Sequence, residues 1–134
     1  MSKNLKLIES YFNALAQGDF ETVGNLFSDD VVWHQPGNAV QSGTYLGKGE
    51  VFNHLGNFSK WSNGTFAIDA LKYIAVNGDL VAATIHFKAE KNDRSSAMDG
   101  IDLFRIENEK IKEVWLFSEK IEEEDEFWNY ASAN

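Results

Sequence analysis

The N-terminal part of the chain has hydrophobic residues at helical spacing. They recur every three or four positions, at Leu5, Ile8, Phe12 and Leu15. This period predicts an amphipathic helix over residues 3–17. Gly18 is suited to the end of that helix, and Asp19 is suited to the start of a second, short helix over residues 20–27.

The pattern then changes to short segments separated by turn residues. Residues 28–30 predict a turn, and residues 31–35 predict a strand that ends at Pro36-Gly37. A loop punctuated by glycines follows this strand. Hydrophobic residues at helical spacing return after the loop and predict a third helix over residues 48–60.

The second half of the chain is rich in β-branched and aromatic residues, and it predicts strands at residues 65–76, 80–90, 96–107 and 110–119. Asn77-Gly78, between the first two, is typical of a tight hairpin turn. A short helix is predicted over residues 121–130. Helices followed by antiparallel strands indicate an α+β fold in a single domain over residues 1–134, in which the helices cover one face of the sheet.

The predicted strands have no purely polar face. In strand 80–90 one face is mixed and the other is apolar, formed by Val81, Ala83, Ile85 and Phe87. Strand 110–119 divides into two faces that each carry apolar residues. We expect such a sheet to be covered on both sides, by helices and a pocket on one side and by a second subunit on the other. The sequence therefore predicts a homodimer.

The composition of the chain limits the classes of molecule that we expect it to bind. The chain has 134 residues, with 12 Lys and Arg against 21 Asp and Glu, and a formal net charge of −9. This charge argues against nucleic acid and anionic membranes as partners, because both are polyanions. No apolar run approaches the roughly 20 residues of a membrane span, and the N-terminus leads into an amphipathic pattern, so we expect a cytoplasmic protein. The aromatic content of 13% hints at a large apolar interior or pocket.

Asp102 is the most informative candidate for chemistry. Period two places it on the same strand face as Met98, Gly100, Phe104 and Ile106. Burial on an apolar face raises the pKa of a carboxyl group, and such a group can donate a hydrogen bond or act as an acid or base. The alternatives are that Asp102 points to the other face, that it is paired with a Lys or Arg, or that it lies at a strand edge.

Three further residues are candidates. Glu113 shares a strand face with Trp115 and Phe117, although a long side chain can reach solvent from a strand end. Tyr11 lies on the flank of the first helix, where its hydroxyl either points into the interior or stays at the core rim. His34 lies at the end of its strand, where it either serves as a base or bonds to the loop backbone.

The histidines predict no metal site. His34, His54 and His86 are 20 and 32 residues apart, which fits no local metal-ligand spacing. A site assembled from distant histidines and a carboxylate is the alternative. The chain has no cysteine, no phosphate-binding loop and no dinucleotide fingerprint. We therefore predict neither a metal nor a cofactor.

Several short motifs occur together in an order that resembles a known superfamily. They are Tyr11 upstream of Gly18-Asp19, the segment 27–37 with its Trp-His-Gln-Pro-Gly end, Gly43 and Gly47, and Ile101-Asp102-Leu103-Phe104-Arg105. In this order, over about residues 5–119, the chain resembles the nuclear transport factor 2-like superfamily. Within that superfamily it resembles the ketosteroid isomerase-like and SnoaL-like polyketide cyclase-like proteins.

The resemblance implies a cone, in which a strongly curved antiparallel sheet wraps around the helices and encloses an apolar pocket, usually in a dimer. It also implies that Tyr11 and Asp102 form an oxyanion hole that stabilises an enolate. The position of the isomerase's catalytic base corresponds to Gln35, whose amide cannot remove a proton from carbon near neutral pH. Glu113 or His34 would then have to move the proton.

The resemblance and the strand periodicity together give a predicted pocket lining of Val31, Trp33, Gln35, Phe52, Leu55, Ala83, Ile85, Phe87, Asp102, Phe104, Glu113, Trp115 and Phe117. We expect the ligand to be a small apolar molecule. One hypothesis is a cofactor-independent isomerase, cyclase or lyase that acts on a carbonyl compound through an enolate. The alternative is a non-catalytic ligand-binding or dimerisation module that has kept the fold and lost the base. A third hypothesis is a protein-interaction adaptor that uses the outer sheet face.

Overall fold

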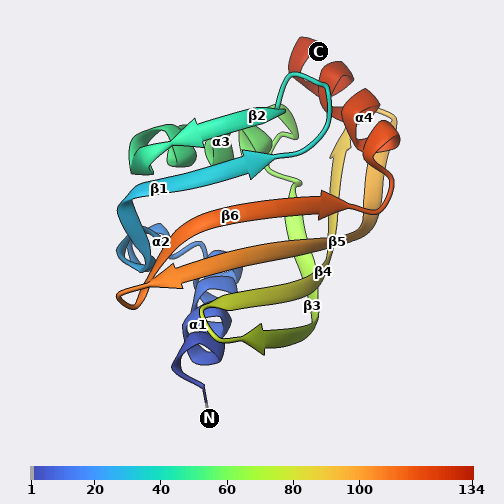
Figure 1. Cartoon of the computed structure of the whole chain (residues 1–134). Helices are drawn as coiled ribbons and strands as arrows, with labels where there is room; N and C mark the ends of the chain where they lie inside the picture. Colours follow the sequence, from blue (N-terminus) through green and yellow to red (C-terminus); the bar gives the residue numbers. More distant parts are fainter. Residues whose placement is uncertain (1) are drawn as a thin grey trace.

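A computed structural model describes residues 2–134 of the chain (Figure 1). Its elements are α1 (Lys3–Gln17), α2 (Phe20–Leu26), β1 (Phe27–Gln35), β2 (Gly43–Leu46), α3 (Gly47–Trp61), β3 (Ala67–Asn77), β4 (Leu80–Lys91), β5 (Arg94–Glu107), β6 (Lys110–Ser118) and α4 (Ile121–Ala133). Every predicted helix is present, with ends that differ from the prediction by at most three residues. No helix within residues 2–134 has the length and apolar character needed to span a bilayer.

The strands form one sheet in the order β2-β1-β6-β5-β4-β3. All neighbours are antiparallel except β1 and β6, which pair in parallel. A parallel pair needs a long connection, and here the chain passes through β2, α3 and three further strands before it returns beside β1. The predicted α+β fold is confirmed, and this one pair makes the sheet mixed.

One edge of the sheet differs from the sequence predictions. Residues 28–30, predicted as a turn, belong to β1, which pairs with β6 from Phe27 onwards and has an irregular register before Val32. β2 lies in the segment predicted as a loop and pairs with β1. A short strand that contains glycine has a weak local signal, because its place depends on hydrogen bonds to the neighbouring strand.

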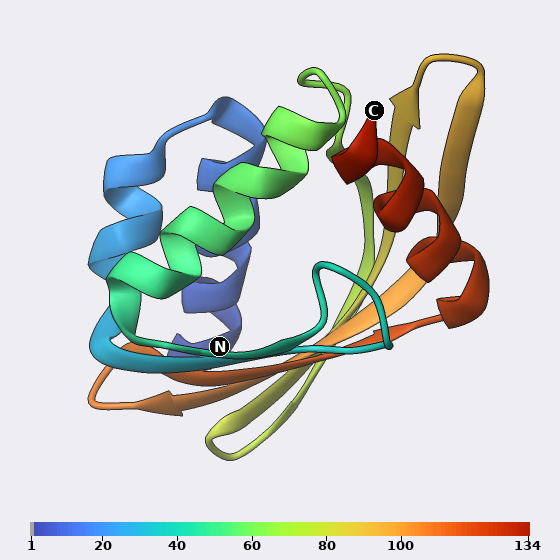
Figure 2. The same cartoon turned by 90° about the horizontal axis from the view of Figure 1, so that it is seen from above.

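The sheet curves around the helices (Figure 2). Helices α1, α2 and α3 lie against its concave side, and α4 lies on the same side at the other end. In β4 the residues that point to this side, Val81, Ala83 and Ile85, are at most 3% exposed. The core therefore lies between the concave face of the sheet and the helices, on the face that the sequence predicts to be apolar.

Gly18 and Asp19 mark the boundary between α1 and α2. Gly18 ends α1 in the left-handed conformation with a φ of 69°, and the Asp19 side chain accepts a hydrogen bond from the Thr22 N–H at 3.2 Å. Within α1, the helical spacing places Ile8 and Tyr11 on the buried face.

A bulge between β5 and β6 changes which residues of β6 face the helices. Ile106 pairs with Ile111, but the next residue of β5, Arg105, pairs with Glu113, so β6 has one extra residue at this point. As a result Ile111 and Val114 are both fully buried although they are three positions apart.

Glu113, Trp115 and Phe117 consequently lie on the outer face of the sheet. Phe117 is 54% exposed and pairs with Ile101, which is 42% exposed. The prediction that these three residues line the interior is wrong. Strict period two along strand 110–119 makes no allowance for the bulge, and a shift of one residue moves every following side chain to the opposite face.

Helix α4 closes one end of the core with a second hydrophobic cluster, formed by Phe58, Ala89, Phe127, Trp128 and Ala131. The ring of Trp128 lies 4.8 Å from that of Phe58, and Trp128 is only 1% exposed. The loop between β1 and β2 also contacts α4, since Asp125 accepts hydrogen bonds from the Asn38 N–H at 2.8 Å and the Gln41 side chain at 3.0 Å. The apolar cluster and the polar loop contacts together hold α4 against the open end of the sheet.

Candidate functional site

Tyr11 and Asp102 lie in the interior, between α1 and β5. Asp102 is on the inner face of β5, where its neighbours across the sheet are Ala83 and Leu116. Tyr11 is 1% exposed and Asp102 is 4% exposed. Asp102 therefore lies on the apolar face, as period two predicts, and not on the outer face beside a basic partner.

Both groups are free to donate hydrogen bonds. Burial raises the pKa of Asp102 to about 7, and the nearby Glu124 carboxyl adds to this effect. Burial and the charge of Asp102 raise the pKa of Tyr11 well above its ordinary value. Among residues 2–134 neither the phenol of Tyr11 nor the carboxyl of Asp102 has a hydrogen-bond partner. The site thus offers a phenol O–H and, in its protonated state, a carboxyl O–H.

Aromatic rings fill the space beside this pair. The ring of Tyr11 packs edge-on against Phe12 and Phe104, with centroids 5.1 Å and 5.3 Å away, and lies 5.8 Å from Phe27. The ring of Tyr11 is therefore held in place by the chain's own aromatic side chains.

Gln35 faces this interior, whereas the adjacent His34 faces outwards. Gln35 is 8% exposed, and its Oε1 accepts hydrogen bonds from Trp33 Nε1 at 2.9 Å and His54 Nε2 at 2.8 Å. An indole N–H can only donate, so the Gln35 atom that Trp33 contacts is the amide oxygen. This oxygen can only accept, so His54 Nε2 carries the proton of the second hydrogen bond. Burial lowers the pKa of His54 to about 4, and its other ring nitrogen has no partner within residues 2–134. His54 is therefore a neutral imidazole at physiological pH.

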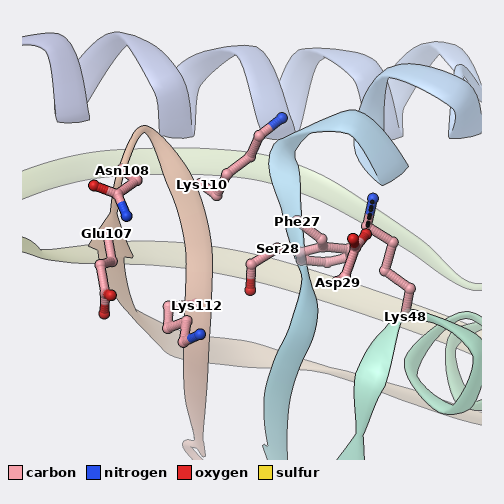
Figure 3. A pocket seen from close by; sticks show the side chains of 8 residues that line it. All are labelled: Phe27, Ser28, Asp29, Lys48, Glu107, Asn108, Lys110 and Lys112. Carbon is pink, nitrogen blue, oxygen red and sulfur yellow. Dashed lines mark ion pairs between the residues drawn. The ribbon is translucent and has the colours of Figure 1, made fainter.

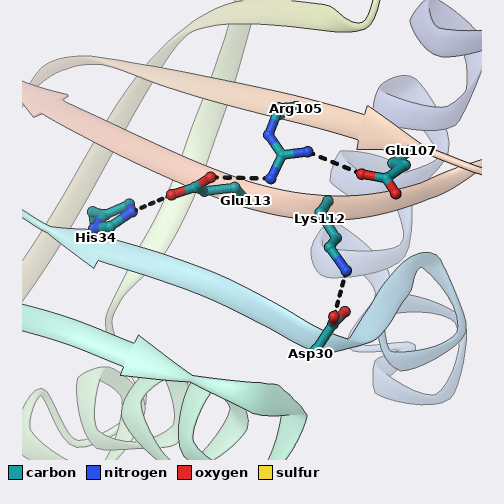
Figure 4. Close-up of polar contacts among 6 residues, drawn as sticks. All are labelled: Asp30, His34, Arg105, Glu107, Lys112 and Glu113. Atoms are coloured by element: carbon teal, nitrogen blue, oxygen red, sulfur yellow. Dashed lines mark hydrogen bonds and ion pairs between the residues drawn. The ribbon is translucent and has the colours of Figure 1, made fainter.

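His34 belongs to a charged network on the outer face (Figure 4). Its Nε2 lies 2.6 Å from Glu113 Oε2, and its ring stacks on Trp115 at 5.6 Å. The other oxygen of Glu113 accepts from Arg105 at 3.1 Å, and Arg105 also donates to Glu107. The hydrogen bonds from His34 and Arg105 lower the pKa of Glu113. Both of the predicted bases, His34 and Glu113, thus lie on the side of the sheet that faces away from Asp102.

The remaining predicted lining residues lie on the inner side of the sheet or on α3 packed against it. They are Val31, Trp33, Gln35, Phe52, Leu55, Ala83, Ile85, Phe87, Asp102 and Phe104. Residues 2–134 bring together no group of three or more His, Asp or Glu side chains arranged to hold a metal ion.

A surface cleft lies elsewhere, between the start of β1 and the β5–β6 turn (Figure 3). It has a volume of about 360 Å³ and is lined by Phe27, Ser28, Asp29, Lys48, Glu107, Asn108, Lys110 and Lys112. Each of its lysines has a polar partner: Lys48 with Asp29, Lys110 with the Asn25 carbonyl, and Lys112 with Asp30. This cleft is an ion-paired groove, and it differs in character from the predicted apolar pocket.

Glu124 is the buried acid that sequence reasoning missed. It is 3% exposed, and its carboxyl accepts hydrogen bonds from Ser118 Oγ at 2.5 Å and Trp128 Nε1 at 3.3 Å. Burial raises the pKa of Glu124, and these two hydrogen bonds act in the opposite direction. A signal was present, because Glu124, Phe127, Trp128 and Ala131 recur at helical spacing. The run of exposed acidic residues around Glu124 masked this spacing in the sequence.

Comparisons with known proteins agree with this fold. A family model described as the SnoaL-like domain matches residues 8–114. A search of curated proteins finds no match. A protein of unknown function with a cystatin-like fold from Xanthomonas campestris is 43% identical, with a TM-score of 0.89 over 93% of this chain and 97% of that one.

Two further solved structures show the same fold at lower identity. Bal32a, from a soil-derived mobile gene cassette, is 23% identical, with a TM-score of 0.90 over 94% of this chain and 96% of its own. IdmH from Streptomyces antibioticus, a candidate polyketide cyclase, is 19% identical, with a TM-score of 0.73 over 90% of this chain and 94% of its own. Because the family model covers most of its length, this chain belongs to the SnoaL-like domain family.

Proposed function

We propose that the chain binds a small apolar carbonyl compound and stabilises its enolate, with Tyr11 and Asp102 as the hydrogen-bond donors. The observation that carries this proposal is the pair of buried donors without partners among residues 2–134. An unpaired polar group in an apolar interior is destabilising. A ligand oxygen that accepts from both groups would remove that penalty.

The charges of the site suit an anionic oxygen better than a neutral one. Tyr11 stays protonated because its pKa is raised, and Asp102 retains its proton below a pKa of about 7. Donors in a water-poor interior stabilise developing negative charge more strongly than donors in water. The likeness to the candidate polyketide cyclase IdmH supports carbonyl chemistry on this fold.

One observation favours the alternative, a non-catalytic ligand-binding module. Gln35 occupies the position that corresponds to the isomerase base, and its amide oxygen is held by Trp33 and His54. An amide in that position orients its neighbours and removes no proton. On this reading Tyr11 and Asp102 bind a ligand and perform no chemistry.

A phenol that mimics an enolate tests the donor pair. We expect 2-naphthol to raise the melting temperature, and Tyr11→Phe and Asp102→Asn each to weaken its binding by roughly tenfold or more, as befits one hydrogen bond to an anionic oxygen. Tyr73→Phe and Asp99→Asn are matched controls on exposed or half-buried positions. Binding that is absent, or equal in all four variants, would reject the donor pair.

We also propose that the outer sheet face pairs with a second copy of the chain. Ile101 and Phe117 lie side by side there and are both more than 40% exposed, next to the ring of Trp115. Contiguous apolar patches of this kind mark interaction surfaces. Light scattering at micromolar concentration should report a dimer that Phe117→Lys converts to a monomer, and a monomeric parent chain would contradict the proposal.

A further inference from the structure

We propose that Glu124 is the acid–base residue of the Tyr11–Asp102 site, and that helix α4 positions it beside the bound ligand. This inference rests on the function proposed above and places a proton acceptor beside the donor pair. It assigns the role predicted for Glu113 or His34 to a residue from a different element. Its basis is the place of the Glu124 carboxyl between α4 and the inner face of β5 and β6.

Two donors hold the Glu124 carboxyl in a defined position. Ser118 Oγ at the end of β6 donates to Oε1 at 2.5 Å, and Trp128 Nε1, one turn further along α4, donates to Oε2 at 3.3 Å. Both oxygens therefore act as acceptors, which is the arrangement of an ionised carboxylate. The group is 3% exposed, and it is turned away from the solvated acidic side of α4.

The strand register places Ser118 near Asp102. Ser118 pairs with Gly100, which lies two residues before Asp102 on the same face of β5. Two residues along a strand correspond to about 7 Å. The edge of the Phe87 ring covers Gly100, 3.0 Å from where a Cβ would stand, and the charge of Glu124 acts on Asp102. Glu124 is thus within reach of a small molecule bound at Asp102.

Tyr11 lies on the opposite side of Asp102. Its ring packs 5.3 Å from Phe104, which is two residues beyond Asp102 on the same face. The order along β5 is therefore Glu124, Asp102 and then Tyr11. A carbonyl oxygen that accepts from Asp102 and Tyr11 would leave the adjacent carbon on the side of Glu124.

This order gives a balanced proton transfer. The Glu124 carboxylate removes a proton from the carbon next to the carbonyl, and the electron pair of the broken C–H bond forms the carbon–carbon double bond of the enolate. The carbonyl oxygen takes the negative charge and accepts hydrogen bonds from Tyr11 and Asp102. Protonated Glu124 then returns the proton to carbon, so the step consumes no other reactant.

The carboxyl groups in the hydrogen-bonded network around His34 cannot remove this proton. Glu113 lies on the outer face and is bonded to His34 and Arg105. A ligand in contact with Asp102 is separated from Glu113 by the thickness of the sheet. The charged group that acts on Glu124 is Asp125, its neighbour on α4, and Glu124 in turn acts on Asp102 in β5.

Hydrogen–deuterium exchange of a simple ketone tests the inference. In D₂O the protein should accelerate exchange of the carbon-bound protons next to the carbonyl of 2-tetralone, followed by proton NMR. Glu124→Gln should slow this exchange by about a hundredfold or more, the usual contribution of a positioned acid–base group. Glu123→Gln, an exposed neighbour on α4, is the matched control and should exchange at the parent rate.

The pH dependence distinguishes a base from a structural residue. Exchange should increase as Glu124 ionises and decrease as Asp102 ionises. Ser118→Ala removes a hydrogen bond that lowers the pKa of Glu124 and should move the rising limb to higher pH. This variant keeps the carboxylate and so tests the inference even if Glu124→Gln fails to fold.

The outcomes separate the inference from the proposed function. Parent protein that binds 2-naphthol but exchanges 2-tetralone no faster than buffer would overturn the role of Glu124 and leave the donor pair intact. Equal exchange by the parent chain and Glu124→Gln, or a rising limb that Ser118→Ala does not move, would also overturn it. If 2-naphthol does not bind at all, the function proposed for Tyr11 and Asp102 is rejected, and the role of Glu124 that rests on it is rejected as well.

Discussion

The pKa of a carboxyl group is shifted in opposite directions on the two faces of the sheet. On the outer face, hydrogen bonds from His34 and Arg105 lower the pKa of Glu113. On the inner face Asp102 has no such partner, and burial raises its pKa to about 7. The comparison teaches that partner and solvent, and not the type of residue, decide whether a carboxyl in this sheet is an acceptor or a donor.

A single bulge separates the two environments. Because β6 has one extra residue between its pairs with Ile106 and Arg105, the apolar and polar positions that follow exchange faces. Without the bulge Glu113 would face the same interior as Asp102. One inserted residue therefore decides which acid joins the buried site and which joins the surface network.

The largest expected difference between the faces concerns packing. Phe104 on the inner face is fully buried, so Phe104→Ala should lower the free energy of unfolding by about 3–5 kcal/mol. Phe117→Ala on the outer face should cost less than about 1 kcal/mol in the unassociated chain, because Phe117 is 54% exposed. Urea unfolding, at a concentration where light scattering shows a monomer, measures both. Equal losses would remove the distinction between the faces.

The next largest effect is the pH dependence that Asp102 confers. Its pKa is raised from 3.8 to about 7, so between these values the unfolded chain has released a proton that the folded chain retains. The free energy of unfolding therefore falls as pH rises through this window, by an amount of the order of 4 kcal/mol. Asp102→Asn should abolish this fall and be more stable than the parent at pH 7. A parent-like slope in Asp102→Asn would contradict the assignment.

His54 should produce a smaller effect of the opposite sign. Its pKa is lowered from 6.5 to about 4, so between these values the unfolded chain binds a proton that the folded chain does not. Stability due to His54 is present above pH 6.5 and is lost as pH falls towards 4, by about 3 kcal/mol. The free energy of unfolding of Asp102→Asn, compared with that of the double variant that adds His54→Gln, isolates the increase with pH that His54 causes. The inference about His54 does not survive if both variants have the same slope between pH 4 and 6.5.

The sequence predicted the elements better than it predicted their faces. The helices and the β3–β4 hairpin follow local periodicity and turn residues, and the structure confirms them. The β2 strand and the parallel β1–β6 pair depend on hydrogen bonds between distant segments, which no local pattern contains. The α+β class was predictable for the same reason, because it follows from the order of the elements.

The candidate site was predictable in part. Asp102 has an unbroken strand pattern around it, and its burial follows from period two. The orientation of Glu113 was not predictable, because the bulge that sets it arises from pairing between β5 and β6. Glu124 required a helical reading of an acidic segment. Its catalytic role, like those of Tyr11 and Asp102, stays a prediction.

The smallest expected effect lies in the outer network. Glu113→Gln removes a carboxylate bonded to His34 and Arg105, and its side chain is 21% exposed. Because the pKa of Glu113 is lowered, its stabilising contribution is present above the pKa of the unfolded chain and is lost as pH falls through the folded value. Solvent screening limits this contribution at neutral pH to below about 1 kcal/mol. The variant should therefore unfold in urea close to the parent at pH 7 and lose its small difference in acid, whereas Asp102→Asn differs most at pH 7. If Glu113→Gln instead gained stability as pH rises through neutrality, the opposite signs assigned to the two faces would be wrong.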